Sequence, residues 1–239
     1  MPSIASEIIK AIKANLWMLL LYSAMVTTFS AMLPTRTGNS GGSYAVVTIL
    51  IYYLHRQVLF DLRLRPSGKP VVAHAAKIPK DSLLRFMLVS GLFIAVALVP
   101  AWFVAFKWAT VHGGLDKQHL MGMLLLLGIP MLWILLSAFG TLLPAAASRQ
   151  PFSVPRAWKA GQKTGLVVAF QLLVFVGLSY AAVFALAVLL NKAFGSTLDA
   201  PPLSYAVEIF FGALFLLPSL MTVVILVRAF KRAYPMSSV

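Results

Sequence analysis

The stretch from Phe86 to Phe106 reads FMLVSGLFIAVALVPAWFVAF and contains no charged residue over 21 positions. A helix rises about 1.5 Å per residue, so a run of this length matches the roughly 30 Å hydrocarbon core of a bilayer. Backbone groups in hydrocarbon must be hydrogen-bonded within the segment itself, which favours a helix over an open strand. The stretch therefore predicts a membrane-spanning helix.

Five further charge-free windows lie on either side of this one. The six windows are Ala14–Thr35, Thr37–Leu54, Phe86–Phe106, Leu120–Ser148, Thr164–Asn191 and Ile209–Val227. They predict an all-α, polytopic transmembrane helical bundle of six spans, at about 14–35, 43–60, 84–106, 120–144, 164–190 and 205–227, in a single domain over residues 1–239. The second window opens with turn-forming residues, so a re-entrant segment is the alternative there. A full crossing requires Gln57–Phe60 to complete that helix and Arg56 to snorkel toward the headgroups.

The composition also indicates a membrane protein. Hydrophobic residues make up 60% of the chain and charged residues 11%, whereas an ordinary soluble domain carries about 25% charge. The mean hydropathy of +0.89 excludes intrinsic disorder. The chain has no cysteine, which excludes disulfides, thiolate metal sites and thiol nucleophiles. Ala14–Thr35 is longer than the apolar core of a signal peptide, so we expect it to remain as the first span.

The basic residues are distributed unevenly between alternate loops. There are 20 Lys and Arg against 6 Asp and Glu, which gives a net charge of +14. With six spans, 16 of the 20 basic residues fall on the side that carries both termini. Short loops rich in Lys and Arg stay in the cytoplasm, so we predict that both termini are cytoplasmic. Attraction to the anionic inner leaflet accounts for the basic excess, and we expect no nucleic-acid partner.

Candidate catalytic and ligand-binding patterns are weak. The cores of the predicted spans contain no ionisable side chain, and phosphate-loop and dinucleotide motifs are absent from the sequence. His112, Asp116 and His119 have metal-ligand spacing, but Gly113-Gly114 interrupts the helix that would align them. The string Gly38 to Gly41 resembles that of rhomboid-type proteases, and we interpret it as a turn because no buried histidine lies opposite its serine. We therefore predict no enzymatic activity, no catalytic or metal-binding residue and no cofactor.

Small residues recur at intervals of four in two of the predicted spans. The third span contains Ala97, Ala101 and Ala105, and the fifth contains Gly177, Ala181 and Ala185. Such ladders let two helix backbones approach closely, so they predict helix contact faces. We expect this packing within one chain, with contact between chains as the alternative.

Two cytoplasmic loops each contain a pair of prolines four residues apart followed by a basic stretch, Pro66 to Lys77 and Pro151 to Lys163. In the second loop we expect Pro155 to begin a short interfacial amphipathic helix. Its apolar edge would carry Ala157, Trp158 and Ala160. The residues expected to contact anionic lipid or a partner are Arg63, Arg65, Lys69, Lys77, Arg156, Trp158, Lys159 and Lys163.

Several short landmarks resemble those of small, uncharacterised six-span inner-membrane proteins of proteobacteria. They are Tyr52-x-x-His55-Arg56-x-x-Leu59, Arg85-Phe86, Leu143-Pro144-Ala145 and Ala157-Trp158. The resemblance covers most of the chain. It implies a multi-pass protein of the bacterial inner membrane, and it supplies neither an activity nor a catalytic residue.

These features favour a non-enzymatic accessory or scaffold protein. It would bind anionic lipid, a membrane-protein partner or a second copy of itself through its basic cytoplasmic face. The alternative is a small oligomeric transporter or permease with a path lined by Gln171 and Glu208. In that case the prolines inside the spans, Pro100, Pro130 and Pro218, would supply kinks. For Glu208 the competing interpretation is a solvated carboxylate at headgroup level.

Overall fold

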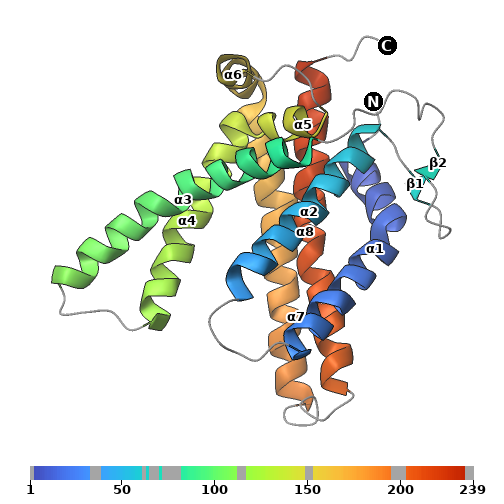
Figure 1. The fold of residues 1–239 in the computed structure, drawn as a ribbon, viewed down its shortest axis with the longest axis vertical. Helices are drawn as coiled ribbons and strands as arrows, with labels where there is room; N and C mark the ends of the chain where they lie inside the picture. Colours follow the sequence, from blue (N-terminus) through green and yellow to red (C-terminus); the bar gives the residue numbers. More distant parts are fainter. Residues whose placement is uncertain are drawn as a thin grey trace. The chain divides into compact units, whose positions relative to one another are not determined.

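The computed structural model describes residues 3–32, 39–60, 63–64, 70–71, 82–111, 117–148, 153–194 and 203–234. This part of the chain is helical apart from a two-residue antiparallel ladder between β1 (Arg63–Leu64) and β2 (Pro70–Val71), as Figure 1 shows. The chain divides into two compact units. Unit 1 comprises residues 1–78 and 170–228, and unit 2 comprises residues 79–169 and 229–239.

Among the described residues, four helical stretches are long and apolar enough to cross a membrane. They are Leu83–Val111, Gly122–Phe139, Val154–Ala193 and Leu203–Ala233. A shorter apolar helix, Val46–Phe60, lies in the window expected for the second span. The prediction of a helical membrane protein is thus confirmed. The count of six spans stays a prediction, and residues 33–38, which end the first predicted span and begin its loop, lie outside the described part.

In unit 1, α1 (Ile4–Met32) lies antiparallel to α8 (Leu203–Ala233). The Ser23 hydroxyl donates a hydrogen bond to the Ile209 carbonyl at 2.7 Å. A Cβ added at Gly212 would overlap the Ser23 hydroxyl oxygen, so the missing side chain permits this close approach. At the other end of the pair, Glu7 of α1 approaches Arg228 of α8. Glu7 and Ser23 are separated by about 24 Å of helix, so these contacts hold the two helices together along most of a membrane thickness.

The second helix of unit 1, α2, spans Asn39–Phe60. It runs to Phe60, which confirms that Gln57–Phe60 completes the helix. Its start corrects the interpretation of Gly38 to Gly41 as a turn, because the helix already begins at Asn39. Asn and Ser are residue types that favour the first positions of a helix, and this preference outweighs the neighbouring glycines. Near its other end, Gln57 Nε2 lies 3.9 Å from Met18 Sδ of α1.

The remaining helical segments of unit 1 are a π-helical turn, η2 (Leu172–Gly177), and α7 (Leu178–Phe194). Ser179 Oγ of α7 lies 3.1 Å from Met221 Sδ of α8, and the two helices run antiparallel. Ala181 and Ala185 of the predicted ladder are exposed. Within unit 1 the contact between α7 and α8 does not use these two alanines, so the partner of this ladder stays a prediction.

In unit 2, α3 (Leu83–Val111) and α4 (Lys117–Phe139) form an antiparallel pair. The alanine ladder of α3 is buried, with Ala97, Ala101 and Ala105 each at most 4% exposed. On α4, a Cβ at Gly128 would lie 2.9 Å from a methyl group of Leu98. Small residues thus line a close helix contact, and the prediction made for this ladder is confirmed.

A short helix, α5 (Leu142–Ala147), follows a turn at the end of α4. The chain therefore leaves the helical path at Phe139, five residues before the expected end of the fourth span at residue 144. All six residues of α5 are buried. The Ser82 hydroxyl, just before α3, donates to the Ala147 carbonyl at 2.9 Å and ties α5 to α3. The glycine of the turn, Gly140, explains the early break, since glycine lowers helix propensity.

Candidate functional site

The basic residues expected in the second cytoplasmic loop belong to a longer helix, α6 (Val154–Gln171), whose residues up to Ala169 lie in unit 2. Ser153 precedes it, and its carbonyl accepts the first helical hydrogen bond, from the Ala157 N–H at 3.0 Å. Serine is a favoured residue at this position. The helix begins one residue before Pro155, and proline is tolerated there because the first-turn N–H groups have no helical partner.

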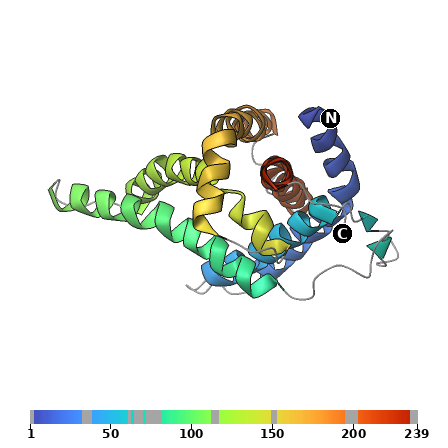
Figure 2. The same ribbon diagram turned by 90° about the horizontal axis from the view of Figure 1, so that it is seen from above.

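One face of α6 packs against the C-terminal end of α4, which it crosses steeply in Figures 1 and 2. Ala157 and Ala160 on this face are buried, as the sequence predicted. A Cβ added at Gly161 would lie 2.7 Å from the carbonyl carbon of Ala138 and closer still to its oxygen. One added at Gly165 would lie 3.1 Å from the carbonyl oxygen of Ser137, the residue before Ala138 in α4. Two glycines four residues apart thus allow the two backbones to meet.

Trp158 was expected on the apolar edge of this helix, and it lies at the border of that edge. Its indole stacks on the ring of Phe139 at the end of α4, with 5.2 Å between centroids and 28° between planes. The side chain is nevertheless 46% exposed. One part of the indole therefore packs on α4, while the rest is open to the surroundings of the protein.

The opposite face of α6 carries the basic residues. Arg156, Lys159 and Lys163 are all exposed. Their spacings of three and four place them on one side of the helix, about 5–6 Å apart from one to the next. The sequence of α6 contains no acidic residue, and among the residues that the structure describes none of the three forms an ion pair. The same side continues with Leu166, which is 90% exposed. A cationic surface thus passes directly into an apolar one.

The other predicted contact residues are in the first cytoplasmic loop. Arg65, Lys69 and Lys77 lie outside the described residues. The backbone of Arg63 is described, and it pairs with Val71 in the ladder of β1 and β2. These residues stay predictions.

The two residues of the predicted transport path, Gln171 and Glu208, lie far apart. Gln171 is half-buried and directly precedes η2, whereas Glu208 is exposed near the start of α8. Since α7 and α8 are antiparallel and joined at Ser179 and Met221, Glu208 is level with the end of α7. Gln171 and Glu208 are therefore separated by roughly 30 Å along the helices. The structure does not bring them into one site.

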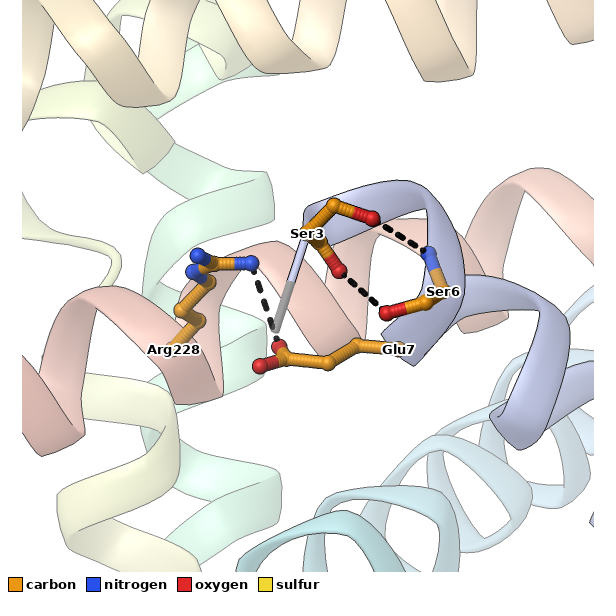
Figure 3. A network of polar contacts seen from close by, with 4 residues as sticks. All are labelled: Ser3, Ser6, Glu7 and Arg228. Carbon is orange, nitrogen blue, oxygen red and sulfur yellow. Dashed lines mark hydrogen bonds and ion pairs between the residues drawn. The ribbon is translucent and has the colours of Figure 1, made fainter. Parts of the chain in front are cut away.

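An ion pair in unit 1 was missed by sequence reasoning. Figure 3 shows Glu7, in the first turns of α1, directed at Arg228 of α8, with 3.5 Å between Oε2 and Nη1. Ser3 caps the same helix end, accepting from the Ser6 N–H at 3.2 Å. An acid near a helix N-terminus and a cation near the C-terminus of its antiparallel neighbour also interact favourably with the helix dipoles. The sequence did contain a signal for this ion pair. Glu7 precedes the first predicted span and Arg228 follows the last one, and the predicted topology places both on the same side of the membrane.

The landmark Tyr52-x-x-His55-Arg56 has a structural role in α2. His55 is 1% exposed, and its Nδ1 lies 2.9 Å from the Ile51 carbonyl oxygen. Because a carbonyl can only accept, Nδ1 carries the proton. Arg56 Nη1 donates to the Tyr52 hydroxyl at 3.1 Å, and its guanidinium lies 5.6 Å from the centre of that ring. These contacts hold the end of α2 together.

For the metal triad considered in the sequence, His112, Asp116 and the side chain of His119 lie outside the described residues. Within the described ranges, no group of three or more His, Asp or Glu side chains is arranged to hold a metal ion. Comparison with family models, with curated proteins and with solved structures finds no match, so the basic face of α6 is interpreted from its own geometry.

Proposed function

We infer that this chain is a non-enzymatic accessory or scaffold protein of the bacterial inner membrane. Its basic cytoplasmic face would bind a protein partner or anionic lipid. The observation that carries this proposal is the position of Arg156, Lys159 and Lys163, exposed together on a helix whose opposite face is fixed against α4.

The fixed backbone of α6 gives these three charges a defined arrangement. A flexible basic loop loses side-chain and backbone conformational entropy when it binds. The backbone of a helix anchored by packing is already ordered, so only the side-chain entropy is lost on binding. Each Lys or Arg near an anionic surface contributes about 1 kcal/mol, so three together supply a substantial binding energy.

The proposed topology has six spans with both termini in the cytoplasm. The excess of basic residues in alternate loops supports it. The contact between Glu7 and Arg228 also supports it, since it places the first turns of α1 and the final turns of α8 at the same end of unit 1. In this topology the basic first turns of α6 lie on the cytoplasmic side.

The test is purification in a mild detergent followed by mass spectrometry of every co-purifying protein, lipid and small molecule. The variant Arg156→Gln/Lys159→Gln should lose a partner that the wild type retains. The matched control is Lys107→Gln/Lys192→Gln, which removes two exposed charges from the opposite predicted side. Identical co-purifying species from all three proteins would contradict the proposal.

The alternative, a small transporter, is favoured by one observation. The backbone departs from α-helical geometry at η2, directly after Gln171, and such π-helical turns are frequent at functional sites. A transporter predicts solute flux in proteoliposomes that is lost in Gln171→Leu or Glu208→Gln. Flux of this kind would replace the scaffold proposal.

A further inference from the structure

The exposed side of α6 consists of a basic part followed, along the helix, by an apolar part. Arg156, Lys159 and Lys163 form a basic part that covers two turns, about 10 Å of helix. Leu166 and Val167 form an apolar part that begins three residues later, and they are 90% and 47% exposed. Exposed apolar side chains of this size on a membrane protein face lipid or a partner rather than water.

The position of α6 in the chain limits where this surface can lie. Lys163 is the last charged residue before the charge-free window Thr164–Asn191, which the sequence predicts as the fifth span. The basic part therefore precedes the predicted hydrocarbon boundary, and Leu166 and Val167 follow it. The headgroup and the acyl chains of one lipid are thus both within reach of this side of α6.

Trp158 independently indicates that this part of α6 lies at the membrane interface. Tryptophan collects at membrane interfaces because its ring is apolar and its N–H is polar. Here the indole is held on Phe139 with nearly half of its surface open. It lies in the turn between Arg156 and Lys159, so the ring is within one helix turn of both charges.

From these three observations we propose that the basic side of α6 is a binding surface for the phosphodiester headgroup of an anionic phospholipid. The phosphate is held between neighbouring cations, and an acyl chain of the same lipid lies along Leu166 and Val167. This inference rests on the proposed function and specifies its ligand. An acidic protein segment would satisfy the charges, but it would leave the apolar part uncovered.

The spacing of the charges suits this ligand. Side chains three and four residues apart on a helix are about 5–6 Å apart, which lets two of them reach the oxygens of one phosphate. The guanidinium of Arg156 is able to donate two parallel hydrogen bonds, whereas Lys159 and Lys163 supply point charges. The sequence of α6 itself contains no carboxylate that would compete for them.

The experiment uses a variant in which Trp158 is the only tryptophan, the other four (Trp17, Trp102, Trp108 and Trp133) being changed to Phe. The full chain is placed in vesicles of phosphatidylcholine that contain a small, equal fraction of brominated phosphatidylglycerol or brominated phosphatidylcholine. Bromine quenches tryptophan over a short range, so the quenching reports which lipid lies beside Trp158.

We expect the brominated phosphatidylglycerol to quench Trp158 several-fold more than the brominated phosphatidylcholine. Adding Arg156→Gln/Lys159→Gln should abolish this preference, since about 1 kcal/mol per charge corresponds to roughly fivefold in binding for each of the two charges removed. Adding Lys107→Gln/Lys192→Gln should leave it unchanged. Equal quenching by the two lipids would overturn the inference.

A second measurement covers the case in which the single-tryptophan variant fails to fold. Native mass spectrometry of the wild type, released from a mixture of the same two lipids, should show bound phosphatidylglycerol that the Arg156→Gln/Lys159→Gln protein lacks. Equal retention of both lipids would overturn the inference. The scaffold proposal would still stand in that case if an acidic protein partner were found bound to α6. Solute flux would remove the scaffold proposal while leaving a measured lipid preference intact.

Discussion

Replacing Gly161 by alanine should separate α6 from α4. In the wild type a Cβ at this position would lie 2.7 Å from the carbonyl carbon of Ala138 and 2.9 Å from its Cα, with the oxygen closer than either. Ordinary contact begins at 3.4 Å, so the backbones must move apart by at least 0.7 Å. The obstacle is backbone rather than a flexible side chain, so rotation of a side chain does not relieve it.

Overpacking of this kind costs about 1–3 kcal/mol, and the loss of the neighbouring aromatic stack would add to it. Two other glycines serve as graded controls. Gly165→Ala meets an atom of α4 at 3.1 Å and requires a shift of only a few tenths of an ångström. Gly122→Ala meets nothing within 4 Å and should be neutral or slightly stabilising, since alanine has the higher helix propensity.

The assay is equilibrium unfolding in mixed detergent, followed by the fluorescence of the single-tryptophan protein that retains Trp158. The free energy of unfolding should fall in the order Gly122→Ala, Gly165→Ala, Gly161→Ala. Only Gly161→Ala should change the emission of Trp158 in the folded state, because the indole moves off Phe139. If Gly161→Ala unfolds at the same denaturant concentration as Gly122→Ala, the close crossing of α6 over α4 is refuted.

Three further experiments test the packing within each unit. Gly212→Ala should destabilise the pair of α1 and α8 by about 1–2 kcal/mol, and Ser23→Ala should recover most of that loss in unfolding experiments, since the added Cβ then lies 3.4 Å from Cβ of residue 23. No recovery would show that the two residues do not meet. A double-mutant cycle of Glu7→Gln and Arg228→Gln should give a coupling of about 0.5–1 kcal/mol, because the pair is only partly buried, and a coupling of zero would contradict the ion pair. Phe139→Leu should shift the emission of the indole stacked on it to longer wavelength, and an unchanged spectrum would argue against the stack.

The individual helices could be predicted from the sequence, because each is a long apolar run bounded by charges. On α3, Arg85 and Lys107 flank a helix segment of about 33 Å, close to the thickness of hydrocarbon. The buried ladder of Ala97, Ala101 and Ala105 could also be predicted, since close packing of two helices requires small residues at this spacing.

Helix partners could not be predicted in the same way. Ala181 and Ala185 belong to a ladder with the same spacing, yet both are exposed. The spacing of small residues shows that a helix face can pack closely, but it does not specify which helix packs there. Conversely, Gly161 and Gly165 approach the backbone of α4 closely, although only a short interfacial helix and the start of a span were expected there. The residues between them, Gln162, Lys163 and Thr164, are polar. Small-residue ladders were expected only in apolar spans, so the two glycines were not recognised as a helix contact.

The candidate site was predicted in part. The sequence indicated Arg156, Lys159 and Lys163 as contact residues of a short helix, and in the structure all three are exposed on α6. It did not predict that one helix, α6, continues from the basic residues through Leu166 to Gln171, because the sequence indicated a short interfacial helix followed by a separate span. The direct passage from cationic to apolar surface at Leu166 depends on that continuity.

The most direct test of the account is the side of the membrane on which α6 lies. The chain has no cysteine, so Lys159→Cys introduces a single reactive thiol at an exposed position. A membrane-impermeant maleimide should leave this thiol unmodified in cells whose inner membrane is intact and should label it in inside-out vesicles. Labelling in intact cells would place the basic face of α6 outside the cytoplasm and contradict both the scaffold proposal and the binding of inner-leaflet lipid.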